Sequence, residues 1–267
     1  MIIHEAKVLA NTEVKPAFYH LHLSCLELAK RAKPGQFALL RCSSNDSVDP
    51  LLRRPLSFHN VFPERGEVSF LYQVKGKGTK ELSRLVAGHT ADVMGPLGTG
   101  FELPGKSKPI AIIGCGVGVA PLVYLACNAH KAGHGIHTFL GARSADSLLD
   151  DPDLVAASTE FSVATEDGSA GTRGNITALL REKIDQLQAC GSAYICGPEA
   201  AMKAAVSICI ELGIPSQVSL ESIMACGVGA CLGCTCSTTR SPSYTRVCTE
   251  GPVFDAKEVV FCGNSQP

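Results

Sequence analysis

The N-terminal part of the chain alternates between hydrophobic and polar positions in short runs. The alternation is clearest at residues 18–23, 36–42 and 67–74, and turn residues such as the Lys-Pro-Gly at 33–35 separate the runs. A period of two is typical of half-buried strands, and strands this short and frequent predict an antiparallel barrel. One helical stretch, residues 79–86, interrupts the pattern.

Beyond residue 105, continuous apolar runs replace the alternation, and helical stretches separate them. The expected strands are residues 110–113, 136–140, 161–164 and 193–196, and the expected helices are residues 120–130, 176–187 and 199–212. Strands that alternate with helices predict a parallel sheet that is covered on both faces.

From residue 221 the chain is rich in Cys, Gly and Thr, and this segment is too polar and too short for a core of its own. The expected fold class is therefore α/β plus all-β, in three parts. These are an N-terminal antiparallel β-barrel (residues 1–102), a parallel-sheet α/β nucleotide-binding domain (103–220) and a small C-terminal subdomain (221–267).

The composition restricts the class of protein further. Of the 267 residues, 45% are hydrophobic and 18% are charged, and the formal net charge is −1. This balance is typical of a soluble globular protein, and it favours neither nucleic acid nor an anionic membrane surface as a partner. The longest uncharged segment, 109–130, is broken by glycines and Pro121, so we interpret it as buried core and not as a membrane span. The chain starts without a basic and apolar leader, and we expect a cytoplasmic protein.

Five of the 13 cysteines lie between residues 226 and 248. Cys226, Cys231, Cys234 and Cys248 follow the C-x4-C-x2-C…C spacing of plant-type [2Fe–2S] ferredoxins. Two irons each need two thiolates, and the glycines between the first three cysteines allow backbone amides to approach the sulfurs. The sequence therefore predicts a [2Fe–2S] cluster held by these four residues.

A structural zinc site, which also takes four thiolates, is the alternative interpretation. Zinc ligands usually come as two C-x2-C pairs, and only one such pair is present. We therefore favour the iron–sulfur cluster. Cys236, a fifth cysteine in the same loop, has no place in the spacing and is expected to be a non-ligand.

Two weak motifs in the barrel favour a flavin dinucleotide when they are taken together. The first, Arg54-Pro55-Leu56-Ser57, lies at the start of a strand. An arginine fork can pair with a pyrophosphate and a serine can bond to a flavin ring atom, although a surface arginine before a strand would look the same. The second, Gly-Lys-Gly-Thr at 76–79, opens a helix, where it forms either an anion site or an ordinary cap.

Two turns in the α/β part are candidates for binding a nicotinamide dinucleotide. The first turn carries Gly114, Gly116 and Gly118, and the second carries Cys196, Gly197 and Pro198. Open α/β sheets bind ligands at the carboxyl ends of their strands, where both turns fall, although the glycine spacing is not that of the G-x-G-x-x-G fingerprint. Cys196 is a candidate for a position beside the nicotinamide, and a buried structural thiol is the alternative.

The order of these features resembles the ferredoxin–NADP reductase superfamily. Within it, residues 219–234 and 246–255 are similar to the cluster loop and the closing segment of the electron-transfer subunits of dihydroorotate dehydrogenase B. The resemblance spans essentially the whole chain and implies FAD on the barrel, NAD on the two turns and a cluster on the four cysteines. The implied FAD contacts are Arg54, Pro55, Leu56, Ser57, Leu71, Tyr72, Gln73, Gly78 and Thr79.

The resemblance also implies a partner subunit that contains FMN and oxidises dihydroorotate to orotate in pyrimidine biosynthesis. Electrons then pass from that FMN through the cluster and FAD to NAD⁺, and the expected assembly is a heterotetramer with two copies of each chain. Cys115 stands where family members commonly have glycine. The residues and the resemblance disagree at Arg143. No acidic residue ends the strand before it, so the residues favour binding of a 2′-phosphate, as in NADP, whereas the resemblance implies NAD.

Two other functions stay open at this point. One is an NAD(P)H-dependent reductase that delivers electrons to another redox protein, although residues 221–267 are fewer than a complete ferredoxin domain needs. The other is a zinc-stabilised binding module without redox activity, which leaves the barrel and both glycine turns unexplained.

Overall fold

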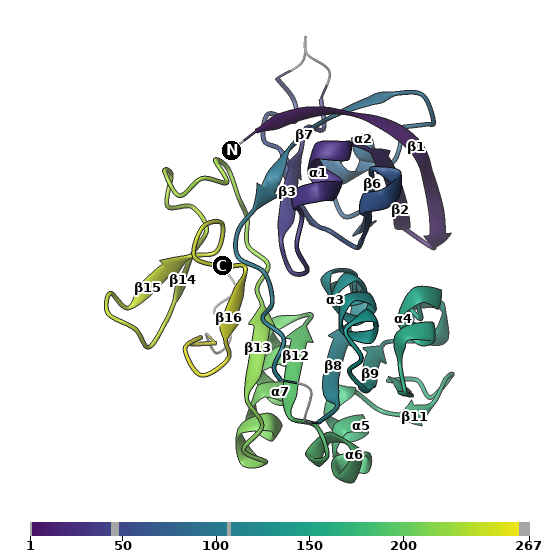
Figure 1. Ribbon diagram of the computed structural model, residues 1–267, viewed down its shortest axis with the longest axis vertical. Coiled ribbons are helices and arrows are strands. Elements are labelled where there is room, and N and C mark those ends of the chain that lie inside the picture. Colours follow the sequence, from purple (N-terminus) through teal and green to yellow (C-terminus); the bar gives the residue numbers. More distant parts are fainter. Residues whose placement is uncertain (1, 44–47, 106–107, 262–267) are drawn as a thin grey trace.

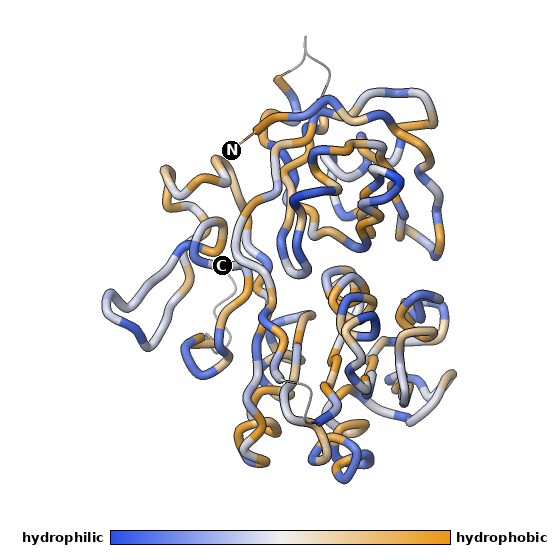
Figure 2. Tube along the Cα trace, viewed as in Figure 1, coloured by the Kyte–Doolittle hydropathy of each residue, from blue (hydrophilic) through white to orange (hydrophobic). Residues whose placement is uncertain are grey.

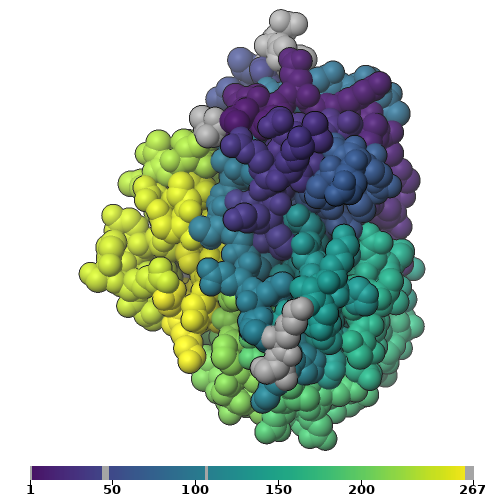
Figure 3. All heavy atoms as spheres, viewed as in Figure 1, coloured from purple at the N-terminus to yellow at the C-terminus, as the bar shows by residue number. Residues whose placement is uncertain are grey.

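The computed structural model describes residues 2–43, 48–105 and 108–261. Figure 1 shows a barrel, an α/β domain below it, and a C-terminal part beside both. The three parts pack into one continuous body (Figure 3). The last residues of the expected subdomain, 262–267, lie outside the described residues. None of the described helices has both the length and the apolar character needed to cross a membrane.

The barrel is a seven-stranded sheet in the order β4-β3-β7-β1-β2-β6-β5, and all its neighbouring strands are antiparallel. Its strands are β1 (Ile3–Lys15), β2 (Phe18–Ser24), β3 (Phe37–Leu40), β4 (Arg54–Ser57), β5 (Asn60–Phe62), β6 (Glu67–Gln73) and β7 (Thr90–Leu97), joined in part by α1 (Leu26–Arg31), η1 (Pro63–Arg65) and α2 (Lys77–Leu82). Leu21 and Leu23 of β2 are fully buried and His22 between them is not, which is the alternation that the sequence predicts. Figure 2 shows apolar and polar positions alternating along the barrel strands. The expected antiparallel barrel is confirmed.

The α/β domain is a second seven-stranded sheet, in the order β11-β10-β9-β8-β12-β13-β16, and its first six strands are parallel. The strands are β8 (Ile110–Cys115), β9 (Ile136–Ala142), β10 (Glu160–Thr165), β11 (Thr172–Arg173), β12 (Ser192–Cys196) and β13 (Ser216–Ser219). The helices are η2 (Gly116–Val119), α3 (Ala120–Lys131), η3 (Ala145–Ser147), α4 (Pro152–Ala157), α5 (Ile176–Glu182), α6 (Ile184–Gln188) and α7 (Glu199–Glu211). Leu122 of α3 and Leu154 of α4 belong to one apolar cluster of the domain, and Leu179 of α5 belongs to the other. The sheet is therefore covered on both faces, as predicted.

Two helices differ from the expected ones by more than one residue at an end or in continuity. The helix expected at 79–86 spans Lys77–Leu82, because the Thr79 hydroxyl closes a capping turn at Gly76. The helix expected at 176–187 is divided into α5 and α6, because Lys183 between them leaves the helical conformation with φ −100° and ψ 31°.

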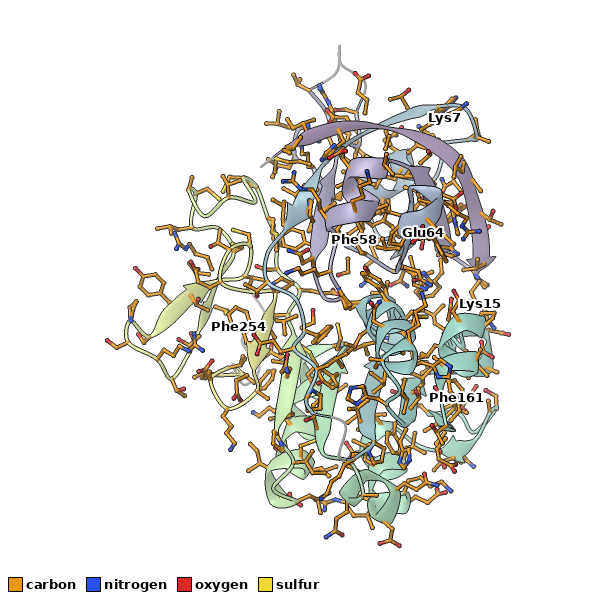
Figure 4. All side chains as sticks on the ribbon, in the orientation of Figure 1. Lys7, Lys15, Phe58, Glu64, Phe161 and Phe254 are labelled. Atoms are coloured by element: carbon orange, nitrogen blue, oxygen red, sulfur yellow. The ribbon has the colours of Figure 1, made fainter. Side chains whose placement is uncertain are left out.

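The C-terminal part is tied to both domains. Its strands β14 (Thr235–Ser237) and β15 (Tyr244–Arg246) form a hairpin, whereas β16 (Val253–Asp255) pairs antiparallel with β13 at the edge of the α/β sheet. In the link between the two domains, the Thr99 amide donates to the Gly251 carbonyl at 2.6 Å. Phe254 of β16 (Figure 4) is buried in the core of the α/β domain. One strand of the C-terminal part is thus shared with the neighbouring domain.

Candidate functional site

The first cavity lies where the three parts meet and has a volume of about 690 Å³. Strands β4 and β6 of the barrel form one wall, the start of α3 forms another, and residues 220–224 after β13 complete it. The predicted FAD contacts that line it are Arg54, Pro55, Leu56, Ser57, Leu71, Tyr72, Gln73 and Thr79. A mostly apolar cavity of this volume that also has polar groups in its lining suits a large cofactor.

Gly78 lies behind the cavity, against the guanidinium group of Arg54. A Cβ atom at Gly78 would lie 2.6 Å from Nε and 2.7 Å from Cζ of Arg54, so the close packing of the two depends on glycine. Arg54 Nη1 donates to the Leu52 carbonyl at 2.6 Å, and Nε and Nη2 form no hydrogen bond within the described residues. An arginine fork with free donors beside a cavity fits a pyrophosphate.

Thr79 shapes the turn that precedes α2. Its hydroxyl oxygen accepts the amides of Lys75 at 3.0 Å and Gly76 at 3.2 Å, and the hydroxyl donates to the Gly76 carbonyl at 3.1 Å. These bonds hold the glycine-rich turn beside Arg54.

The second cavity, of about 790 Å³, lies over the carboxyl ends of β8, β9 and β12. Gly116, Gly118, Gly197 and Pro198 line it, as the sequence predicts for a dinucleotide site. Gly114 lies within β8 instead, where a Cβ atom would come within 3.1 Å of Leu140. A Cβ atom at Gly118 would lie 2.5 Å from the Gly197 backbone, so the two turns are in direct contact.

Cys196 and Cys115 occupy different surroundings at the ends of neighbouring strands. Cys196 is 2% exposed and lines neither of these two cavities. Burial raises the pKa of its thiol, and the nearby charge of Glu221 raises that pKa further. Cys115, one position beyond the partner of Cys196 in the sheet, lines the second cavity. Of these two thiols, Cys115 is thus the one that lines the second cavity.

Four residues line both cavities and mark where the cavities meet. They are Gln73, Lys75, Val117 and Glu221. Burial raises the pKa of Glu221, and the charge of Lys75 opposes that rise, which places the two charged groups within reach of one another. Sequence reasoning missed Lys75 and Glu221 as site residues. Glu221 lies two residues beyond β13, a strand that the sequence did not predict, so its place at a strand end could not be foreseen.

The four predicted cluster ligands form two pairs of thiols. The Cys231 side chain contributes to the lowered pKa of Cys226, and the Cys234 side chain contributes to the raised pKa of Cys248. No three His, Cys, Asp or Glu side chains of the described chain surround a single metal position. A [2Fe–2S] cluster needs two thiolates for each of its two irons, which is the number that these four cysteines supply.

Backbone amides point at these sulfurs. Cys226 Sγ accepts the amides of Val228 and Cys231, both at 3.4 Å, and Cys248 Sγ accepts the amide of Gly229 at 3.2 Å. The two amides lower the pKa of Cys226 to about 6, whereas burial raises the pKa of Cys248 to about 11. Amide donors around paired thiols fit the predicted [2Fe–2S] cluster.

Arg246 fastens the loop to the segment that carries Cys248. Its Nη1 donates to the Gly229 carbonyl at 3.2 Å, and its Nε donates to Glu250 Oε2 at 2.9 Å. The backbone amide of Arg246 donates to the same carboxylate oxygen at 2.9 Å. This network holds the two cysteine segments together from the outside.

Comparison with known proteins agrees with this geometry. A family model described as the iron–sulfur cluster binding domain of dihydroorotate dehydrogenase B matches residues 221–260, and an oxidoreductase NAD-binding domain matches residues 112–207. The dihydroorotate dehydrogenase B (NAD(+)) electron transfer subunit of Desulforamulus reducens is 39% identical over 261 residues, which cover 97% of this chain and 98% of that protein. This chain belongs to the family of dihydroorotate dehydrogenase B electron-transfer subunits.

Other relatives support the assignment to this family. The protein of the same name from Caldanaerobacter subterraneus is 37% identical over 261 residues, covering 96% of this chain and 98% of that one. A solved structure described as an NADH-dependent reduced ferredoxin–NADP oxidoreductase has a TM-score of 0.83 at 30% identity, covering 97% of this chain and 90% of that chain. The predicted family, the fold, the NAD-linked oxidoreductase class and the set of FAD, [2Fe–2S] and NAD cofactors are confirmed at the level of the family.

Proposed function

We propose that this chain is the electron-transfer subunit of a dihydroorotate dehydrogenase complex in pyrimidine biosynthesis. Its partner carries FMN and oxidises dihydroorotate to orotate. When bound, the cluster and FAD supply the one-electron and hydride chemistry that connects that FMN to NAD⁺. The proposal includes a cytoplasmic complex with two copies of each chain.

The observation that carries the proposal is the continuity of the three sites. Met224, two residues before Cys226, lines the first cavity, and Lys75 and Glu221 line the first and the second cavity together. A flavin in the first cavity therefore lies between the dinucleotide turns and the cysteine loop. This order is what electron transfer between a cluster and NAD⁺ requires.

In this proposal, three parts of the chain bind the three cofactors: residues 1–102 bind FAD, residues 103–220 bind the dinucleotide and residues 221–267 bind the cluster. In the proposal, Arg54 pairs with the FAD pyrophosphate, while Leu71, Tyr72 and Gln73 bound the cavity beside the flavin. Gly116, Gly118, Gly197 and Pro198 allow the dinucleotide to approach the backbone. Cys196 is buried and lines neither cavity, so we assign it the role of a structural thiol and not a position beside the nicotinamide. Cys226, Cys231, Cys234 and Cys248 hold the cluster.

The cysteine loop is the surface that we assign to the partner. Cys231 is exposed, and the apolar side chains of Ile223, Val228 and Leu232 near it are 86%, 40% and 52% exposed. Exposed apolar groups beside a redox centre fit a protein interface, because electrons must leave the chain where the cluster is accessible.

The experiment is co-expression with an FMN-containing dihydroorotate dehydrogenase, followed by assay of NADH formation from dihydroorotate and NAD⁺. Leu232→Asp should weaken association with the partner by at least about tenfold and leave the cluster absorbance intact. Leu232 has φ 59°, a conformation that Asp tolerates well, so the variant should fold. Val155→Asp on α4, where the native valine is 43% exposed, is the matched control. A stable complex without dihydroorotate-dependent NADH formation would overturn the proposal.

One observation favours a second function, that of a reductase for another redox protein. The solved relative with a TM-score of 0.83 is described as a ferredoxin–NADP oxidoreductase. If the native partner recovered with this chain lacks FMN and accepts electrons from NADH, this second function replaces the first.

A further inference from the structure

Arg143 follows β9, at the position where sheets of this kind usually carry an acid for the adenosine ribose. The sequence alone therefore favours a 2′-phosphate and NADP. The structure places an acidic residue at this position from the next strand. Glu166 follows β10, and both Arg143 and Glu166 line the second cavity.

The register of the sheet brings the two residues side by side. Ala142 and Thr165 are paired, the Glu166 amide donates to the Ala142 carbonyl at 3.1 Å, and the next amide, of Asp167, donates to the Arg143 carbonyl at 3.2 Å. Arg143 and Glu166 thus leave the sheet at the same level on adjacent strands.

Glu166 lies within electrostatic reach of Cys115, which lines the same cavity. Burial raises the pKa of the Cys115 thiol to about 11, and the charge of Glu166 contributes to that rise. Cys115 ends β8, which is separated from β10 by β9. Cys115, Arg143 and Glu166 therefore surround the carboxyl ends of β8, β9 and β10, where an open α/β sheet binds its ligand.

Asp167, the neighbouring acid, is engaged elsewhere. Its Oδ1 accepts the Ser169 amide at 3.0 Å and the Ser169 hydroxyl at 2.6 Å, and Asp167 does not line the cavity. The Glu166 carboxylate forms no hydrogen bond or ion pair with the described residues, so both its oxygens can accept bonds from a ligand.

We propose that Glu166 is the residue that selects NAD(H) over NADP(H), by accepting the ribose hydroxyls and by repelling a 2′-phosphate. The inference rests on the proposed function and names the dinucleotide class of its second cavity. A ribose diol offers two donors to one carboxylate, whereas a phosphate brings up to two negative charges next to it. Such repulsion is an effective way to reject a close analogue. Arg143 can bind a 2′-phosphate only when this carboxylate is removed.

The experiment measures binding of ADP-ribose and 2′-phospho-ADP-ribose to the purified holoprotein by calorimetry, so it needs no electron transfer. The wild-type chain should prefer ADP-ribose. Glu166→Gln should shift the ratio of the two affinities by at least about tenfold towards the phosphorylated probe. Adding Arg143→Gln should remove the gain, and Glu166→Asp should keep the wild-type preference.

Asp167→Asn is the matched control, because it removes an equal charge one residue away. A shift in Asp167→Asn equal to that in Glu166→Gln would show a general charge effect and overturn the inference. An unchanged ratio in Glu166→Gln would also overturn it, while the proposed function stood. If the wild-type chain bound neither probe, the dinucleotide site and the proposed function would fail together.

Discussion

Around the two cavities the strands carry fully buried apolar side chains, whereas the cysteine loop has few of them. Ile112 and Ile113 of β8 and Ile195 of β12 are at most 1% exposed. In the loop, by contrast, Ile223 is 86% exposed and Cys231 is open to solvent. The loop keeps its shape through amide–sulfur contacts and through the bonds of Arg246.

Because of this difference, the two regions should respond differently to substitutions and to loss of the cluster. Burial of apolar side chains stabilises the barrel and the α/β domain without any cofactor. The loop has little such burial, and binding of the cluster is expected to contribute to its folding. A change at a cysteine should therefore affect the cluster and leave the domains folded, whereas a change at a strand end should affect folding or nucleotide binding.

The largest expected effect is that of Cys231→Ser. Iron content should fall from about two per chain towards zero, because a hydroxyl is a poor replacement for a thiolate ligand. Flavin content and the thermal unfolding of the two domains should stay as in the wild type. Cys236→Ser is the control and should keep its iron. Loss of flavin together with iron would contradict the separation of the two regions.

Arg54→Ala tests whether Arg54 contributes to the binding of FAD. Loss of a charge-assisted contact with the pyrophosphate should cost about 1.5–3 kcal/mol, which is a roughly 10- to 150-fold weaker affinity for FAD. The measurement is fluorescence titration of the flavin-free chain. Arg84→Ala is the control, since Arg84 pairs with Glu81 on the exposed side of the barrel. Equal FAD affinity in the two variants would remove the assigned role of Arg54.

Gly118→Ala tests the contact between the two dinucleotide turns. The added Cβ would meet the Gly197 backbone at 2.5 Å, so we expect a loss of about 1–3 kcal/mol in the free energy of unfolding. Urea denaturation measures it, with Gly105→Ala as a control because a Cβ atom there meets nothing within 4 Å. If Gly118→Ala were as stable as this control, the turns would not be tightly packed.

The smallest effect concerns the contact between the barrel and α4. Asp151 caps α4 by accepting the Asp153 amide at 2.9 Å, and its other carboxylate oxygen lies 3.2 Å from Nε2 of the buried His59. Asp151→Ala should cost about 0.5–2 kcal/mol. Asp151→Asn keeps a capping oxygen, so it should lose only the part that depends on charge.

The pH dependence of this effect has a definite sign. Burial alone would raise the pKa of Asp151, but the bond and charge of His59 and two backbone amides lower it overall. The contribution of its charge is therefore complete above about pH 4 and is lost as the pH falls further. Urea denaturation at several pH values should show the wild type and Asp151→Asn converging in acid. A constant difference would contradict the ionic contact.

Much of the fold could be predicted because its patterns are local. The alternation at 18–23 and the apolar run at 110–113 each correspond to a strand in the structure, β2 and β8. The cysteine spacing predicted the thiol loop for the same reason. The pairing of β16 with β13 could not be predicted, because three residues in an irregular segment carry no periodicity.

The residues that the sequence did not identify come together only through tertiary pairing. Glu166 reaches the site of Arg143 because β10 lies beside β9, and Lys75 reaches Glu221 across the junction of two domains. Cys196 and Cys115 differ because a shift of one position along a strand turns a side chain to the other face. Such relations depend on strand order, which a single sequence does not state.

The most direct test of the central claim is an anaerobic titration of the purified chain with NADH, followed by its visible spectrum. Iron, zinc and flavin are assayed on the same sample. We expect about two irons and one flavin per chain, with both the flavin and the cluster absorbance bleached by NADH. A chain that contained flavin and zinc without iron, or whose cluster stayed oxidised while the flavin was reduced, would contradict the central claim.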